Sequence, residues 1–129
     1  VRRVFIDPQI ISTSAELSDY EEGCLGVPGV YETIQRPAKV SVQAYNENGK
    51  MFTLDAEGLL ARIIQHEYDH LEGMLFIDRG DPEVAQKTVE QFKKRAEKAE
   101  KRAAEKEAKA RKIAAKKAAA EAKKAAKKA

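Results

Sequence analysis

The chain has 129 residues, which is room for one domain and an appendage, and its net charge of +3 conceals two segments of opposite charge. Residues 1–79 carry 7 Lys and Arg against 13 Asp and Glu, whereas residues 80–129 carry 17 against 8. The single cysteine excludes an internal disulfide, and no apolar run approaches the roughly 20 residues of a membrane span. We therefore expect a soluble, cytoplasmic protein with no membrane partner.

Apolar side chains are divided as unevenly as the charge. Among the 20 hydrophobic residues of segment 80–129, 16 are alanines. Any packed core must therefore lie in residues 1–79, and we predict one folded domain there, followed by a Lys/Ala-rich helical extension over residues 80–129. A segment this short buries only about 60% of the surface of its unfolded chain, so a bound metal ion or partner would add needed stability.

The first elements along the chain are expected to be extended. Residues 4–6 and 10–11 predict a strand, and Asp7-Pro8 between them is typical of a sheet edge or a bulge. Residues 12–23 are polar and are expected to form a loop that leads to Cys24.

A hairpin is predicted next. Residues 39–45 alternate apolar and polar side chains, and the turn-forming residues 46–49 precede an apolar stretch at residues 51–54. Further along the chain, residues 74–77 predict a brief extended piece that closes the domain.

A helix is predicted over residues 57–72, where the apolar period changes from two to 3.6, with Asp55 as its cap and Gly73 beyond its end. At about 100° per residue, two adjoining stripes result: Leu59, Ile63, His66 and His70 form one, and Leu60, Ile64 and Leu71 form the other. Both histidines are therefore expected at the margin of the buried face.

After Pro82 the composition predicts a long helix, because no Gly or Pro occurs from Glu83 onward. Beyond Phe92 the only large apolar residue is Ile113, so this helix should project into water. Its excess of Lys and Arg would attract RNA phosphates without sequence specificity, since no aromatic residues are interleaved. The alternative is a solvated helix or a partly disordered tail.

The sequence Gln65-His66-Glu67-Tyr68-Asp69-His70 contains His-Glu-x-x-His, which on a helix places two imidazoles one turn apart so that both can reach one cation. Glu67 lies between them and can serve as a general base for water held by the metal. A structural metal site or a plain polar helix edge remains the alternative.

Two histidines leave a coordination sphere incomplete. The only thiol of the chain, Cys24, is the obvious third ligand, since a thiolate and two imidazoles suit a divalent transition metal with one open position. The competing interpretation is that Cys24 is merely a small buried apolar residue.

Two sequence motifs occur in the same order and at about the same spacing as in a known protein family. Glu22-Gly23-Cys24-Leu25, with Pro28 three residues further on, precedes the Gln65–His70 motif by about forty residues, and Glu57-Gly58-Leu59-Leu60-Ala61 leads into the helix. Together these motifs resemble the peptide deformylase family over residues 1–79. A generic zinc protease would explain only the histidine motif.

The resemblance implies a metal-dependent hydrolase that removes the formyl group from the formylmethionine of nascent chains. It implies Cys24, His66 and His70 as ligands of one divalent ion, Fe²⁺ first and Zn²⁺ or Ni²⁺ as substitutes. Glu67 would be the acid/base, and the backbone N–H of Leu25 would bind the carbonyl oxygen as it becomes anionic. The family's supporting ion pair corresponds to Glu22 and Arg36, and the methionine pocket to Leu59, Ile63 and His66.

The expected fold is α+β, with antiparallel strands packed around a central metal-binding His-Glu-x-x-His helix and followed by the long basic C-terminal helix. The expected partners are a formyl-Met nascent peptide and, through the basic helix, the ribosome and its RNA. The chain is expected to be a monomer.

Two features depart from the family pattern. The family's glycine-rich motif, G-x-G-L-A-A-x-Q, would lie upstream of Val1, so we expect an N-terminally truncated form, and losing the oxyanion donor of that motif would cost about 10² to 10³ in rate. Gly26 stands where the family has serine, which predicts a looser cysteine loop. The alternative function is therefore a catalytically impaired relative that binds the ribosome or RNA through its basic helix.

Overall fold

The computed structural model describes residues 2–128, and its contacts divide the chain into two compact units, Val1–Gln86 and Lys87–Ala129. The composition predicts a boundary after residue 79, which is a few residues before the division between these two units. As a domain boundary it stays a prediction. Each unit is described by itself.

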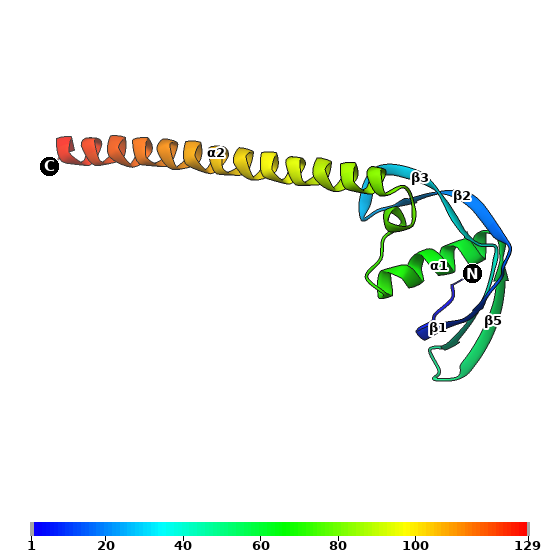
Figure 1. The fold of residues 1–129 in the computed structure, drawn as a ribbon. Coiled ribbons are helices and arrows are strands. Elements are labelled where there is room, and N and C mark those ends of the chain that lie inside the picture. Colours follow the sequence, from blue (N-terminus) through cyan, green and yellow to red (C-terminus); the bar gives the residue numbers. More distant parts are fainter. Residues whose placement is uncertain (1, 129) are drawn as a thin grey trace. The chain divides into compact units, whose positions relative to one another are not determined.

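The elements follow one another as β1 (Ile6–Thr13), β2 (Leu17–Cys24), β3 (Val27–Pro37), β4 (Lys39–Tyr45), β5 (Met51–Glu57), α1 (Gly58–Leu71), a 3₁₀ turn η1 (Phe76–Arg79) and α2 (Pro82–Lys128). All strand pairs are antiparallel: β1, β4 and β5 form one sheet in that spatial order, and β2 pairs with β3 in a separate hairpin (Figure 1). The prediction of an α+β fold with antiparallel strands and a long C-terminal helix is confirmed.

The three-stranded sheet has the edge and the turn that the sequence predicts. Strand β1 is an edge strand, and its register with β4 shifts between Ile6 and Gln9, where Asp7 has a positive φ of 49°. The predicted hairpin is confirmed as β4 and β5, and the Asn46 side chain closes its turn by accepting hydrogen bonds from the backbone N–H groups of Asn48 and Lys50.

The prediction of a loop over residues 12–23 is wrong. Strand β1 continues to Thr13, and β2 occupies Leu17–Cys24, paired with β3 from Leu17 opposite Pro37 onward. Of the β2 side chains only Glu22 is buried, so the strand lacks the apolar alternation that would reveal it. Backbone hydrogen bonds to β3, which do not depend on side-chain polarity, define this strand instead.

The prediction of an extended piece at residues 74–77 is also wrong for residues 76 and 77. Residues Phe76–Arg79 form a 3₁₀ turn, and the backbone N–H of Leu75 donates to Asp78 Oδ2 at 2.8 Å. A side-chain acceptor three residues along favours a tight helical turn over a strand at this position.

Helix α1 lies where the apolar period predicts it, although the predicted cap is wrong. Glu57 is the N-cap residue and makes no side-chain capping hydrogen bond. Asp55 lies within β5, where its carboxylate accepts a hydrogen bond from Ser41 Oγ across the sheet. Gly73, with a positive φ of 74°, follows the C-terminus as expected.

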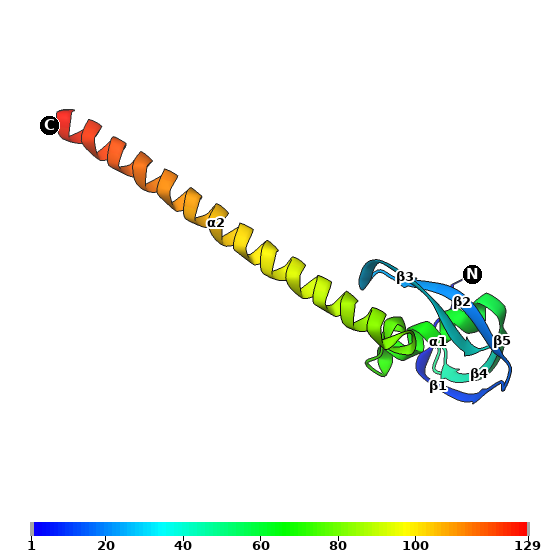
Figure 2. The ribbon, with the colours of Figure 1, turned by 45° about the horizontal axis from the view of Figure 1, so that its top comes forward.

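The buried face of α1 is more polar than its sequence suggests. A small apolar cluster of Val40, Ala56 and Ala61, with Leu60 and Ile64 against it, joins α1 to β4 and β5. The other buried residues of the helix are Arg62, Gln65 and Asp69, and each forms a hydrogen bond with a residue of β3. Figure 2 shows α1 beside the β2–β3 hairpin. Three residues of the predicted apolar stripes are instead exposed: Leu59, Ile63 and Leu71.

Helix α2 runs without interruption from Pro82 to Lys128, which confirms the long helix predicted after Pro82. Asp81 precedes it, and Asp81 Oδ1 accepts a hydrogen bond from the backbone N–H of Glu83. Nearly every residue of α2 beyond Thr88 is exposed. Within residues 2–128, no helix has the length and apolar character needed to cross a membrane.

Candidate metal centre

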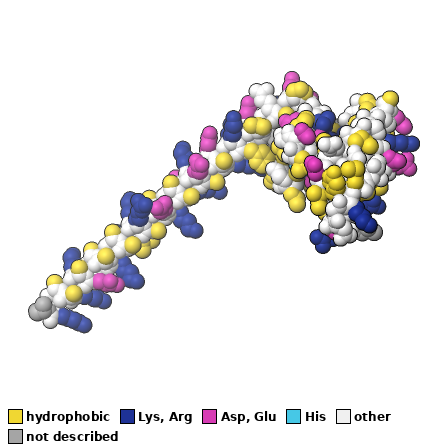
Figure 3. Space-filling model, turned by 90° about the horizontal axis from the view of Figure 1, so that it is seen from below, with side chains coloured by type: hydrophobic (Ala, Val, Ile, Leu, Met, Phe, Trp, Pro, Cys, Tyr) yellow, Lys and Arg dark blue, Asp and Glu magenta, His cyan; other side chains and the backbone are white. Residues whose placement is uncertain are grey.

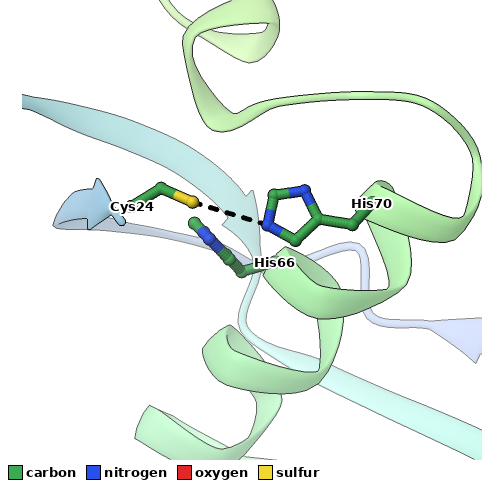
Figure 4. A group of neighbouring side chains, drawn as sticks. All are labelled: Cys24, His66 and His70. Carbon is green, nitrogen blue, oxygen red and sulfur yellow. Dashed lines mark hydrogen bonds between the residues drawn. The ribbon is translucent and has the colours of Figure 1, made fainter. Parts of the chain in front are cut away.

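Three side chains that the sequence predicts as ligands lie together in the structure. Cys24 ends strand β2, and His66 and His70 lie one turn apart on α1 (Figure 4). One ligand atom from each residue lies within 4.8 Å of the other two, and Cys24 Sγ is 3.6 Å from His70 Nε2. A tetrahedral ion bound at usual Zn–S and Zn–N lengths would hold such a pair about 3.5 Å apart.

The imidazole rings of His66 and His70 each form a hydrogen bond at Nδ1. This bond determines which ring nitrogen is available to bind a metal ion. His70 Nδ1 lies 3.2 Å from the backbone carbonyl oxygen of Met74, which can only accept, so Nδ1 carries the proton. His66 Nδ1 lies 2.9 Å from Glu22 Oε1 and donates to this carboxylate. Both rings therefore keep the Nε2 lone pair for a cation, which is the arrangement found around metal-ligating histidines.

Glu22 connects the cysteine strand to the histidine helix. Its side chain is almost fully buried and accepts hydrogen bonds from Arg36 Nε at 2.7 Å and Nη2 at 2.9 Å, and from Arg62 Nη1 at 2.9 Å, in addition to the His66 ring. A buried carboxylate with four donors is fully satisfied, so it fixes the ring orientation of His66 relative to β2.

The guanidinium group of Arg36 also contacts a second buried carboxylate, Asp69, which precedes His70 in the sequence. Arg36 Nη1 donates to Asp69 Oδ2 at 2.7 Å, and Arg79 Nε and Nη2 donate to Asp69 at 2.6 and 2.8 Å. Arg62 also donates to the backbone carbonyl oxygens of Ile34 and Ser18, which attaches α1 to the hairpin. We call the set Glu22, Arg36, Arg62, Asp69 and Arg79 the buried ion network.

Sequence reasoning identified only the Glu22–Arg36 part of the buried ion network. Arg62, Gln65 and Asp69 recur at spacings of three and four residues, which is the period of a helix face. Such a row of polar residues at helical spacing is the signal that could have revealed a buried polar face.

The network holds both carboxylates in their ionised form. Burial raises the pKa of Glu22, but hydrogen bonds from Arg36, His66 and Arg62 outweigh burial and keep this pKa below its ordinary value of 4.5. Burial likewise raises the pKa of Asp69, and hydrogen bonds from Arg79 and Arg36 bring it below 3.8. The same pairing raises the pKa values of Arg36 and Arg79.

These shifts predict how stability depends on pH. A carboxyl group with a lowered pKa in the folded state stabilises the fold above its ordinary pKa and loses this contribution as the pH falls through the folded-state value. The contribution of Glu22 and Asp69 to the free energy of unfolding of the metal-free chain should therefore be fully present and constant near neutral pH, and should decrease below about pH 4.5. Urea titrations over this range, with chelator present, measure it, and a rise in stability on acidification would contradict the expectation.

The predicted acid/base residue lies beside this centre. Glu67 is exposed on α1 and lines a pocket of about 210 Å³. The other lining residues are Tyr20, Glu21, Glu22, Gly23, Leu59, Arg62, Ile63 and His66. The three residues that the resemblance assigns to a methionine pocket, Leu59, Ile63 and His66, are all among them, and His66 is also a candidate metal ligand.

The turn after Cys24 contains Leu25, whose backbone N–H is the predicted donor to the substrate carbonyl. Leu25 follows Cys24 in the β2–β3 turn and is fully exposed, so its side chain contributes nothing to the core. At Gly23, before the cysteine, a Cβ would lie 2.7 Å from the ring of the exposed Tyr31, so this side chain would have to move. At Gly26 a Cβ would lie 3.7 Å from Cys24 Sγ, an ordinary contact, so a side chain would fit there.

A cysteine sulfur from a hairpin and two imidazoles from one helix, beside an exposed carboxylate and a pocket, form a donor set that would suit a single divalent ion. The comparisons agree, because the family model of polypeptide deformylase matches residues 1–86. The chain therefore belongs to the polypeptide deformylase family, as its two motifs predict.

Individual relatives give the extent of the match. Peptide deformylase of Treponema pallidum (strain Nichols) is 61% identical over 79 residues, which are 61% of this chain and 49% of that protein. Peptide deformylase of Borreliella burgdorferi is 50% identical over 91 residues, 70% of this chain and 55% of the relative. The crystal structure of Arabidopsis thaliana peptide deformylase 1B in complex with an inhibitor matches with a TM-score of 0.69 at 39% identity, covering 75% and 55% of the two chains. The chain spans about half the length of the curated relatives it matches.

Proposed function

We propose that the chain carries the metal centre of a peptide deformylase and hydrolyses the formyl group from the formylmethionine of nascent polypeptides. The observation that carries this proposal is the approach of Cys24, His66 and His70 to within 4.8 Å, with both ring Nε2 lone pairs available. In this assignment α1 is the central metal-binding helix of the fold, and residues 1–79 form the catalytic part.

The donor set fits a divalent transition metal, with Fe²⁺ as the proposed ion and Zn²⁺ or Ni²⁺ as substitutes. Such an ion, when bound, supplies a water molecule of lowered pKa and polarises a carbonyl group. Cys24, His66 and His70 hold it, and Glu22 keeps the His66 ring in position through the hydrogen bond to Nδ1.

The remaining residues act on the substrate. Glu67 accepts the proton of the attacking water and delivers it to the amine nitrogen as the formamide C–N bond breaks, so that formate and a free N-terminus result. The backbone N–H of Leu25 donates to the carbonyl oxygen as negative charge develops. Leu59 and Ile63, both half exposed along the 210 Å³ pocket, receive the methionine side chain.

The proposal extends to the setting of the reaction. All three ligands come from one chain, so a monomer suffices. A formylated nascent chain is found where proteins are synthesised, which places the activity in the cytoplasm. The ribosome is the proposed partner, and the Lys/Ala-rich extension, residues 80–129, is the part with the positive charge to reach its RNA.

Formate release from a formyl-Met dipeptide tests the proposal. The chain is prepared without metal and then given Fe²⁺ under anaerobic conditions, or Ni²⁺, and formate is measured with a coupled dehydrogenase. We expect release that depends on the added ion and is absent from the Cys24→Ala variant. Stoichiometric metal binding without formate release would contradict the activity and leave the metal site standing.

A further inference from the structure

The ring of His70 is held less directly than the ring of His66. His66 Nδ1 donates to the buried carboxylate of Glu22 at 2.9 Å. His70 Nδ1 instead donates to a neutral acceptor, the backbone carbonyl oxygen of Met74, at 3.2 Å. A hydrogen bond to a charged acceptor is shorter and about twice as strong as one to a neutral acceptor. The orientation of the His70 ring toward Cys24 (Figure 4) therefore depends on how firmly the Met74 carbonyl group is held in place.

Met74 lies in the short segment of residues 73–81 that joins α1 to α2. Gly73, with its positive φ, ends the helix, and the backbone N–H of Met74 then donates to the backbone carbonyl oxygen of Asp69 at 2.8 Å. This bond returns Met74 to the last turn of α1. The Met74 carbonyl group is thereby placed beside the ring of His70.

The segment is attached to α1 a second time, through Arg79. Arg79 Nε donates to Asp69 Oδ2 at 2.6 Å and Arg79 Nη2 donates to Asp69 Oδ1 at 2.8 Å, which is a bidentate contact of fixed geometry. Asp69 therefore holds the segment at two points, through its backbone at Met74 and through its carboxylate at Arg79. Only residues 75–78 lie between the two points, so a displacement of Arg79 reaches Met74 over a short span.

Arg79 is not needed to compensate the charge of Asp69. The Asp69 carboxylate also accepts from Arg36 Nη1 at 2.7 Å, so a buried cation remains beside it when Arg79 is removed. The side chain of Arg79 is 41% exposed, against 2% for Arg36, so its replacement leaves no buried charge without a partner. What Arg79 contributes beyond charge is the second attachment of the segment to α1.

We propose that Arg79 is a positioning residue of the metal centre. Through its contact with Asp69, the Met74 carbonyl group stays at its place beside the imidazole. His70 Nε2 is thereby kept free of a proton and directed toward Cys24 Sγ, 3.6 Å away. Groups that orient a ligating imidazole in this way typically change metal affinity by about 10- to 100-fold. The proposal deepens the proposed function and rests on it in one respect, that His70 is a metal ligand.

The test compares three full-length variants with the parent chain. Arg79→Gln removes the bidentate contact, and Arg79→Lys keeps a positive charge that can reach one carboxylate oxygen. Arg111→Gln is the matched control, since Arg111 also donates to a carboxylate at 2.6 Å, that of Glu107, but is 78% exposed on α2. Figure 3 shows the Lys and Arg side chains of this helix standing out from its surface.

The first measurement uses the metal-free chain with ¹⁵N-labelled histidine. Long-range ¹H–¹⁵N spectra at about pH 8, where free imidazole is neutral, report which ring nitrogen carries the proton. In the parent chain both His66 and His70 should carry it at Nδ1. In Arg79→Gln the His70 ring should show a mixture of both tautomers, while His66, which Glu22 holds, should keep its Nδ1 proton. A general loosening of the fold would instead change both rings.

The second measurement is a titration with Co²⁺, followed through the charge-transfer absorption that a thiolate ligand gives. Arg79→Gln should bind Co²⁺ about 10- to 100-fold more weakly than the parent chain, Arg79→Lys should be intermediate, and Arg111→Gln should equal the parent. A parent chain that binds no Co²⁺ would contradict the proposed metal centre, whereas the tautomer measurement would still decide the role of Arg79.

Two kinds of result would overturn the proposal. An unchanged His70 tautomer in Arg79→Gln, or a Co²⁺ affinity equal to that of a metal-binding parent, would show that the buried residues of η1 hold Met74 without Arg79. An equal change at His66 and His70, or failure of both Arg79 variants to fold, would show that Arg79 serves the stability of the fold and not the position of one ring.

Discussion

Replacement of Arg36 by methionine is expected to lower the free energy of unfolding by about 3–5 kcal/mol. The Arg36 side chain is 2% exposed and bridges Glu22 and Asp69, whose side chains are 4% and 5% exposed. Without Arg36, Glu22 loses two of its four donors and Asp69 loses one, and neither carboxylate gains access to water. Urea unfolding at neutral pH, followed by circular dichroism, measures the change.

The matched control is Lys39→Met at an exposed ion pair. Lys39 lies 3.5 Å from Glu57, and their side chains are 61% and 75% exposed, so this substitution should cost no more than about 1 kcal/mol. If both methionine variants lost the same stability, the buried ion network would have no special role in the fold. An Arg36→Met chain that unfolds without denaturant agrees with the expectation, because a unit this small has little stability to lose.

The second large effect concerns Glu67. If this residue transfers the proton, Glu67→Gln should reduce formate release by about 10²- to 10⁴-fold while the chain still binds its ion. The ion is retained because Glu67 is not among the three clustered ligand candidates. Co²⁺ serves as the spectroscopic probe, since a thiolate ligand gives a charge-transfer absorption band.

Cys24→Ala is the complementary variant, and it should lose the Co²⁺–thiolate band together with the activity. The two substitutions therefore separate proton transfer from ion binding. Loss of the band in Glu67→Gln would show that Glu67 supports the ion rather than the proton transfer. Retained activity in Cys24→Ala would remove Cys24 from the ligand set.

The candidate site could be predicted from sequence to the extent that it depends on local spacing. His66 and His70 are four residues apart on a segment whose apolar period is that of a helix, and the helix forms as Gly58–Leu71. The position of Cys24 beside them depends on a family motif rather than on any local rule, because Cys24 lies 42 positions before His66 in the sequence. The structure places its Sγ 3.6 Å from His70 Nε2.

The fold was harder to predict from the sequence where strands carry polar side chains. The pairing of β2 with β3 over Leu17–Cys24 and Val27–Pro37 is made by backbone groups, and β2 buries a single side chain, the carboxylate Glu22. A polar, exposed strand has the composition of a loop, so composition alone assigned residues 12–23 wrongly. The buried positions of Arg62 and Asp69 were missed for a related reason, since charged residues are seldom buried unless they are paired.

The sequence by itself determined the candidate ligand types, the one-turn spacing of the two histidines, the family and the uneven charge of the long helix. Each of these is a property of residue identity or of a period along one helix. Only the tertiary structure decided that Glu22 accepts from His66 and that Arg36 joins Glu22 to Asp69. These contacts join residues from three different elements, and a buried charge is stable only where all its partners meet. Their convergence is a consequence of strand pairing and helix packing, which no local pattern of residues specifies.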